Sequence, residues 1–131
     1  MAAVTRFNPD AVHAPAGAYS HAGKVKAGSE MLYIAGQVGV AKDGTTPPGI
    51  EGQTEIVFSN IKAVLEAGGF TVADLVKINL FIVANQIASV GKVREIRARH
   101  MGDVKPASTL VYVSALAAPE LLLEVEAIAA K

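Results

Sequence analysis

The spacing of apolar and polar residues changes several times along the chain, and each change marks a different expected element. Short runs rich in apolar and β-branched residues, bounded by glycine and polar residues, are typical of strands. Such runs lie at residues 20–25, 31–38, 75–83, 108–115 and 121–129. The segment 26–29 between the first two runs predicts a hairpin turn, and the segment 41–49, rich in Gly, Pro and Thr, predicts a loop.

Two other segments carry apolar residues at helical spacing. From about residue 52 to residue 67 these positions recur every three or four residues, and the pair Gly68-Gly69 supplies a C-terminal stop. A second helix is expected to begin with Ser89 as its N-cap and to end at Gly102. The resulting order, β-β-α-β-α-β-β, predicts an α+β fold in which a single mixed sheet carries both helices on one face.

The strand sequences also predict self-association. The runs at residues 75–83 and 121–129 place apolar residues on both faces of the sheet instead of alternating cleanly. Two helices can bury one of these faces, and a chain of 131 residues has nothing left to bury the other. We therefore expect a second copy of the chain to cover it, so that the protein is a homo-oligomer.

Composition narrows the class of protein. A chain of 131 residues with 51% hydrophobic residues and no net charge predicts one soluble domain over residues 1–131. Its apolar stretches are far shorter than the roughly 20 residues of a membrane span, and its N-terminus lacks the apolar core of a signal peptide, so we expect a cytoplasmic protein. The absence of cysteine excludes disulfides, thiolate metal sites and cysteine nucleophiles.

Two carboxylates are the first candidates for chemistry. Glu124 and Glu126 are two residues apart on an expected strand, so their side chains point to the same side. Carboxylates close together on a largely apolar strand suit a general acid or base. The alternative is that one or both lie exposed at a sheet edge, or pair with a lysine such as Lys77.

Tyr19, His21 and Gly36 are further candidates. Tyr19 and His21 share a strand face if the first strand begins early, which would place a phenol beside an imidazole, although a lone tyrosine is often a core or interface residue. The remaining histidines show no metal-ligand spacing relative to His21, so we expect no metal and no cofactor. Gly36 interrupts a strand, which marks either a bulge or the close approach of a ligand.

A basic run near the second helix is the one feature that suggests nucleic acid. It includes acidic residues and lacks interleaved aromatic residues for base stacking, so its simplest interpretation is a solvated helix face, and nucleic-acid binding is not expected. The basic residues of the run are Lys92, Arg94, Arg97, Arg99, His100 and Lys105.

Three motifs together resemble the Rid (YjgF/UK114) family over residues 17–129. They are Gly17-Ala18-Tyr19-Ser20-His21, Ala35-Gly36-Gln37 and Lys105-Pro106-Ala107-Ser108-Thr109-Leu110, the last set before the apolar run of residues 122–129. The resemblance implies a chorismate-mutase-like fold and a homotrimer whose sheets face a central core, with small-molecule clefts between subunits. It further implies imine hydrolysis, in which Glu124 orients the attacking water, Tyr19 lies in the cleft and Gly36 borders it.

The chain departs from the family pattern within the cleft. Ser108 stands where the deaminating members carry an arginine that grips the substrate carboxylate. By alignment, Gly91 replaces a helix asparagine, Ala35 replaces a serine, and Leu110 replaces a small residue or cysteine. Loss of an arginine clamp of two charge-assisted hydrogen bonds would weaken carboxylate binding by about two to four decades.

These departures leave two functions open. The first is hydrolysis of an imine, enamine or related C–N substrate that lacks the carboxylate of a 2-imino acid, with Glu124 activating water, Tyr19 holding the substrate, and Ser108, Gly36, Ala35, Gly91, Leu110 and His21 shaping the pocket. The second is a non-catalytic trimer that binds a metabolite or a partner protein. Ribonuclease activity is a third and weaker interpretation. Arg97 or Arg99 of a neighbouring subunit could restore the missing positive charge.

Overall fold

The computed structural model describes residues 2–131 and contains six strands and two α-helices in that range. The connection before β4 contains the short 3-10 helix η1 (Val72–Asp74), and η2 (Ala84–Ser89) leads into α2. In chain order the elements are β1 (Val4–Phe7), β2 (Ala22–Val25), β3 (Met31–Val38), α1 (Ile50–Ala67), β4 (Leu75–Val83), α2 (Val90–Met101), β5 (Ala107–Val113) and β6 (Leu123–Ala130).

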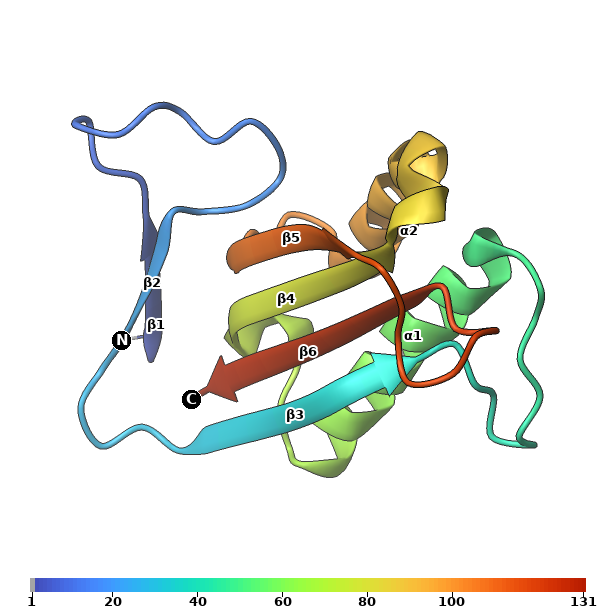
Figure 1. Cartoon of the computed structure of the whole chain (residues 1–131). Coiled ribbons are helices and arrows are strands. Elements are labelled where there is room, and N and C mark those ends of the chain that lie inside the picture. The colour runs from blue at the N-terminus through green and yellow to red at the C-terminus, as the bar shows by residue number, and fades with distance from the viewer. Residues whose placement is uncertain (1) are drawn as a thin grey trace.

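Four strands form one mixed sheet in the order β3-β6-β4-β5. The pairs β3–β6 and β4–β6 are antiparallel, and β4 and β5 are parallel because α2 carries the chain back between them. Both α-helices lie behind this sheet in Figure 1. The expected α+β fold with two helices on one face is therefore confirmed.

The N-terminal part of the topology differs from the expectation. The chain contains an additional strand, β1, and β2 pairs with β1 instead of forming a hairpin with β3. The β1–β2 ribbon is a second, two-stranded sheet beside the ends of the main strands (Figure 1). It is held there by Val4, which packs with Val76 and Ala130. Beyond β2 the backbone N–H of Lys26 still donates to the carbonyl oxygen of Ala3, so the expected turn continues the pairing with β1, and β3 remains an edge strand that pairs, among residues 2–131, only with β6.

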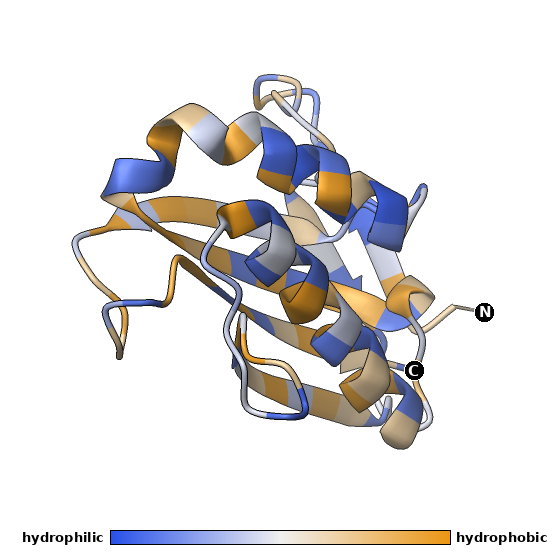
Figure 2. Ribbon diagram, turned by 90° about the vertical axis from the view of Figure 1, so that its right-hand side faces the viewer, coloured by the Kyte–Doolittle hydropathy of each residue, from blue (hydrophilic) through white to orange (hydrophobic). Residues whose placement is uncertain are grey.

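The core lies between the main sheet and the helices. Alternate residues of β4, namely Ile78, Leu80 and Ile82, are at most 1% exposed, as the period-two alternation of a strand requires. The buried side chains of α1 cover them, among them Phe58 and Ile61. Figure 2 shows the corresponding alternation of apolar and polar residues along strands and helices. No helix within residues 2–131 is long and apolar enough to cross a membrane.

The opposite face of the sheet, called here the open face, carries no helix. It presents Glu124 and Glu126 of β6 next to Phe81 and Asn79 of β4. Asn79 Nδ2 donates a hydrogen bond of 3.0 Å to Glu126 Oε1, so Glu126 pairs with an amide and not with a lysine. Tyr33 of β3 is 72% exposed. The open face thus combines satisfied polar groups with exposed aromatic surface.

A buried glutamine ties the loops to the start of β6. Gln53 of α1 is fully buried, and its Nε2 donates to the carbonyl oxygens of Pro47 at 2.8 Å and Glu120 at 2.9 Å. Its Oε1 accepts the backbone N–H of Leu122 at 2.9 Å. Gly39 lies directly against Gln53, where any β-carbon would meet the helix backbone. These contacts fix the position from which β6 carries Glu124.

Candidate functional site

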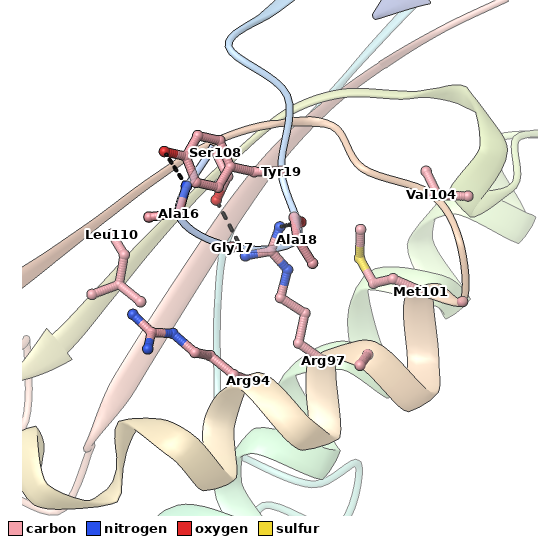
Figure 3. A pocket seen from close by; sticks show the side chains of 12 residues that line it. Ala16, Gly17, Ala18, Tyr19, Arg94, Arg97, Met101, Val104, Ser108 and Leu110 are labelled. Carbon is pink, nitrogen blue, oxygen red and sulfur yellow. Dashed lines mark hydrogen bonds between the residues drawn. The ribbon is translucent and has the colours of Figure 1, made fainter. Parts of the chain in front are cut away.

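A pocket of about 270 Å³ lies at the edge strand β5, on the side of the sheet that faces α2. Figure 3 shows its walls, which come from the loop of residues 16–19, from α2 and from β5. Its lining includes Tyr19, Arg94, Arg97, Met101, Ser108 and Leu110. The motif residues Tyr19, Ser108 and Leu110, which the sequence placed in one site, are therefore brought together.

The strand register explains why the β5 residues face this pocket. Ser108 lies beside the buried Ile78, and Leu110 lies beside the buried Leu80, so both point toward the helices. The loop that carries Tyr19 is attached to β5, because Ser20 Oγ donates to the carbonyl oxygen of Lys105 at 2.6 Å. This attachment holds the Tyr19 ring at the pocket.

Arg97 reaches into the pocket from α2 of the same chain. One of its terminal nitrogens donates to Ser108 Oγ at 3.3 Å and the other to the carbonyl oxygen of Ala18 at 3.1 Å (Figure 3). Burial lowers the pKa of Arg97, and the charge of Arg94 lowers it further. A guanidinium thus stands next to the serine that replaces the family arginine, and it comes from the same chain instead of from a neighbouring subunit.

The helical period accounts for the inward position of Arg97. It lies four residues from Val93 and four residues from Met101, both of which are buried, so it falls on the stripe of α2 that faces the sheet. Arg97 itself is half-buried. The spacing of Arg97 from these apolar residues is the feature of the sequence that indicates its inward position. The interpretation of the whole basic run as a solvated helix face is therefore wrong at Arg97.

Two other members of the basic run do lie on a solvated surface. Lys92 Nζ is 2.6 Å from Glu51 Oε1, and Arg99 pairs with Glu55 at 2.8 Å, with all four side chains largely exposed. Their positive charges are balanced by α1. The run is therefore not a continuous basic surface, and only part of it faces the pocket.

A second group of expected site residues lies on the open face. The carboxylate of Glu124 rests against Gly36, where an added β-carbon would lie 2.7 Å from Glu124 Cδ and 2.9 Å from Cγ. The β3–β6 register shifts between Ile34 and Gln37, which makes an irregularity at Gly36. Gly36 is thus a position of close approach, and the group that approaches is the Glu124 side chain.

The two groups do not meet within one chain. Glu124 pairs with Phe81, and Ser108 pairs with Ile78, three residues away on the same strand. Side chains an odd number of residues apart point to opposite faces, so Glu124 and Ser108 lie on opposite sides of the sheet. The pocket lining accordingly includes Tyr19 and Ser108 but not Glu124.

Three further expected site residues lie apart from this pocket. Ala35 is exposed on β3 and lines a shallow hollow of the open face, and Gly91 is exposed in the first turn of α2 with no atom near its would-be β-carbon. His21 Nε2 lies 2.6 Å from the carbonyl oxygen of His13, which engages the imidazole within its own loop. No group of three potential metal ligands occurs in the described part of the chain.

Known proteins resemble this chain in sequence over most of its length. The profile of the Endoribonuclease L-PSP family matches residues 10–131. A RutC family protein of Pyrococcus horikoshii is 40% identical over 119 residues, covering 89% of this chain and 90% of the relative. A 2-iminobutanoate/2-iminopropanoate deaminase of Dermatophagoides farinae is 38% identical over 71 residues, which are 52% of each chain.

Solved structures agree with the sequence relatives. YyfB of Yersinia pestis, described as a protein of unknown function in the conserved Rid family, superimposes with a TM-score of 0.86 at 33% identity, covering 97% of this chain and 98% of that one. TdcF of Escherichia coli, solved with bound serine, gives a TM-score of 0.69 at 28% identity over 100% and 98% of the two chains. The fold, the motifs and the matched length together place this chain in the Rid family, whose profile is that of Endoribonuclease L-PSP.

Proposed function

We propose that this Rid protein hydrolyses an imine or enamine at a site completed between the subunits of a homotrimer. The observation that carries the proposal is the division of its polar groups between the two sides of one sheet. The Glu124 carboxylate rests on Gly36 on the open face, whereas the Tyr19 hydroxyl lies at the pocket behind β5. A neighbouring copy that packs against the open face would bring its own pocket to Glu124.

The chemistry assigned to these groups is acid–base catalysis of water addition. The Glu124 carboxylate accepts a proton from a water molecule as the water oxygen bonds to the imine carbon, and the C=N π electrons move to nitrogen. Glu124 then returns this proton to the nitrogen, which gives a neutral carbinolamine. Transfer of the hydroxyl proton to the nitrogen breaks the C–N bond and expels ammonia as the C=O bond forms. The Tyr19 hydroxyl holds the nitrogen or a substrate oxygen by hydrogen bonding, and the apolar wall at Leu110 limits the size of the substrate.

Similar proteins support a small-molecule site of this kind. One relative carries the name of a 2-imino acid deaminase, and one structural neighbour holds serine. The family description also names an endoribonuclease. The ion pairs of Lys92 and Arg99 with α1 speak against a basic track for RNA, because a phosphate backbone is bound by uncompensated positive charge.

The first experiment measures ammonia release from imines generated in situ, with matched variants of neighbouring carboxylates. Glu124→Gln should abolish the acceleration, because an amide cannot accept the proton of the attacking water. Glu126→Gln is the control, since it makes the same chemical change two residues away, at a group that accepts a hydrogen bond from Asn79. Acceleration that survives Glu124→Gln unchanged would overturn the proposed mechanism. Binding without turnover in the wild-type protein would instead establish a metabolite-binding trimer.

A subunit-mixing experiment tests the shared site. Glu124→Gln and Tyr19→Phe chains are each expected to be inactive alone, because every interface lacks one group. When the two variants are unfolded, mixed in equal amounts and refolded together, roughly a quarter of the interfaces would combine an intact Tyr19 with an intact Glu124. Activity should therefore return to about that fraction of the wild-type rate. If mixing restores nothing while light scattering shows trimers, the two groups do not serve one site.

A further inference from the structure

Arg94 and Arg97 place two positive charges at one pocket without an acidic partner. Within residues 2–131, the recorded ion pairs join Lys92 to Glu51, and Arg99 and His100 to Glu55, and none involves Arg94 or Arg97. Both arginines nevertheless line the pocket of about 270 Å³ behind β5. Two cations in a concave, partly dry site create a potential that favours an anion, and the one carboxylate that a neighbouring Glu124 would bring still leaves one positive charge in excess.

The position of Arg97 is fixed by neutral acceptors that leave its charge unbalanced. Its terminal nitrogens use two hydrogens to donate to Ser108 Oγ and to the carbonyl oxygen of Ala18. A guanidinium carries five N–H groups in a planar fork, so three remain for a ligand. Burial disfavours the charged form of Arg97, and so does the charge of Arg94, which is why its pKa is lowered. An anion at this point would relieve both effects.

The remaining walls indicate what the anion is attached to. Met101, Val104 and Leu110 contribute apolar side chains to the pocket, with Leu110 on the side of Arg94 and with Met101 and Val104 beyond Arg97 (Figure 3). Its volume lies at or below the lower limit of ordinary ligand pockets, which begin at roughly 300 Å³. The space therefore suits a short alkyl chain that ends in a planar acid, and a carboxylate matches the fork of a guanidinium by two parallel hydrogen bonds.

We propose that Arg97, assisted by Arg94, binds the carboxylate of a small 2-imino or 2-oxo acid, and so performs from α2 the role that Ser108 cannot perform from β5. The substrate expected from the sequence alone lacked this carboxylate because position 108 lacks an arginine. Ser108 contributes by being small, since it leaves room for the guanidinium of Arg97 and accepts one of its hydrogen bonds. This proposal depends on the proposed function for the C=N group of the ligand. The negative charge of the ligand is inferred from the two arginines alone.

The test is equilibrium binding to the assembled wild-type protein, measured by calorimetry with 2-oxobutanoate and with its neutral isostere 2-oxobutanamide. The wild-type protein should prefer the acid. Arg97→Gln should weaken binding of the acid by about two to four decades, the range of two hydrogen bonds to a charged group, and leave the amide unaffected. Arg99→Gln is the matched control, because it removes the same charge from the outer face of α2 and should leave both affinities unchanged.

Two further variants separate ligand binding from folding. Arg94→Gln changes an exposed side chain that makes no recorded hydrogen bond, and it should weaken the acid by about two- to fivefold, as for a solvated charge pair. The double variant Arg97→Gln/Ser108→Arg moves the guanidinium from α2 to β5 and should recover most of the lost preference. A purely structural role of Arg97 predicts no such recovery.

The proposal fails if the wild-type protein does not distinguish the acid from the amide, or if Arg97→Gln weakens both ligands equally. Its failure can be told apart from failure of the proposed hydrolysis, because binding of 2-oxobutanoate needs no turnover. If the protein binds the acid through Arg97 but releases no ammonia, the carboxylate site is supported and the proposed imine hydrolysis is refuted.

Discussion

Gly36→Ala is expected to separate the activity of this protein from its stability. The added methyl group would lie 2.7 Å from Glu124 Cδ and 2.9 Å from Cγ, well inside the van der Waals contact that begins near 3.4 Å. The atoms in its way belong to the end of a flexible side chain, not to the backbone. Glu124 can therefore yield by rotating, which withdraws its carboxylate by the better part of an ångström.

The magnitudes differ sharply for folding and for catalysis. An off-rotamer side chain costs about 1 kcal/mol, and replacing glycine by alanine at an ordinary φ recovers roughly 0.4–1 kcal/mol by restricting the unfolded chain; Gly36 is not among the glycines with positive φ. The free energy of unfolding should thus change by no more than about 1 kcal/mol. A misplacement of about 1 Å in a catalytic group costs on the order of 100-fold in rate.

The assay is ammonia release in parallel with thermal unfolding, using Gly49→Ala as the control. Gly49 has extended backbone geometry and no atom within 4 Å of its would-be β-carbon, so the same substitution meets no neighbour there. We expect full activity from Gly49→Ala and about one hundredth of it from Gly36→Ala. A Gly36→Ala protein that melts normally and keeps its full rate would refute the idea that the carboxylate must rest on residue 36.

Three other substitutions test the packing and the charges that support the site. Gly39→Ala places a β-carbon against the backbone and side chain of Gln53, which cannot rotate away, so urea unfolding should show a loss of about 1–3 kcal/mol. Gln53→Glu turns the donor to two carbonyl oxygens into a buried carboxylate, and its deficit of about 3 kcal/mol at pH 7 should shrink as acid protonates it. Burial raises the pKa of Glu55, but hydrogen bonds from His100 and Arg99 outweigh burial and hold it below its ordinary value of 4.5. Because the folded-state pKa is the lower one, the stability that Glu55 contributes is present above pH 4.5 and is lost as the pH falls through the folded-state pKa. Glu55→Gln should therefore be less stable than wild type at pH 7, and the difference should shrink as the pH falls below 4.5.

The sequence predicts the elements well where periodicity is long and uninterrupted. The bounds of β3 and β4 agree with the expected segments, because each is rich in apolar residues over eight or nine positions. β1 was missed, since four residues beside a proline-containing loop carry too little pattern to identify a strand. Pairing partners depend on the whole sheet, so the exchange of a β2–β3 hairpin for a β1–β2 ribbon could not be read from local sequence.

In the site, likewise, features within one strand could be predicted from the sequence, whereas contacts between elements could not. Glu124 and Gly36 could each be singled out from its own strand, and the structure adds that they touch. The inward position of Arg97 depends on the small side chain that faces it, and Ser108 is eleven residues away on another element. A charged residue on an amphipathic helix is ordinarily assigned to solvent, and only the packing of α2 on β5 reverses that assignment.

The partnership of Arg97 with Ser108 bears on how such proteins are classified. Sorting sequences by the residue at the β5 position alone would group this chain with proteins that have no guanidinium in the pocket, although its pocket holds one within 3.3 Å of that serine. A rule that reads the strand residue together with the helix residue facing it would assign the chain differently. When a functional side chain is missing from one element, the substrate can be inferred only after the facing element has been checked for a residue that replaces it.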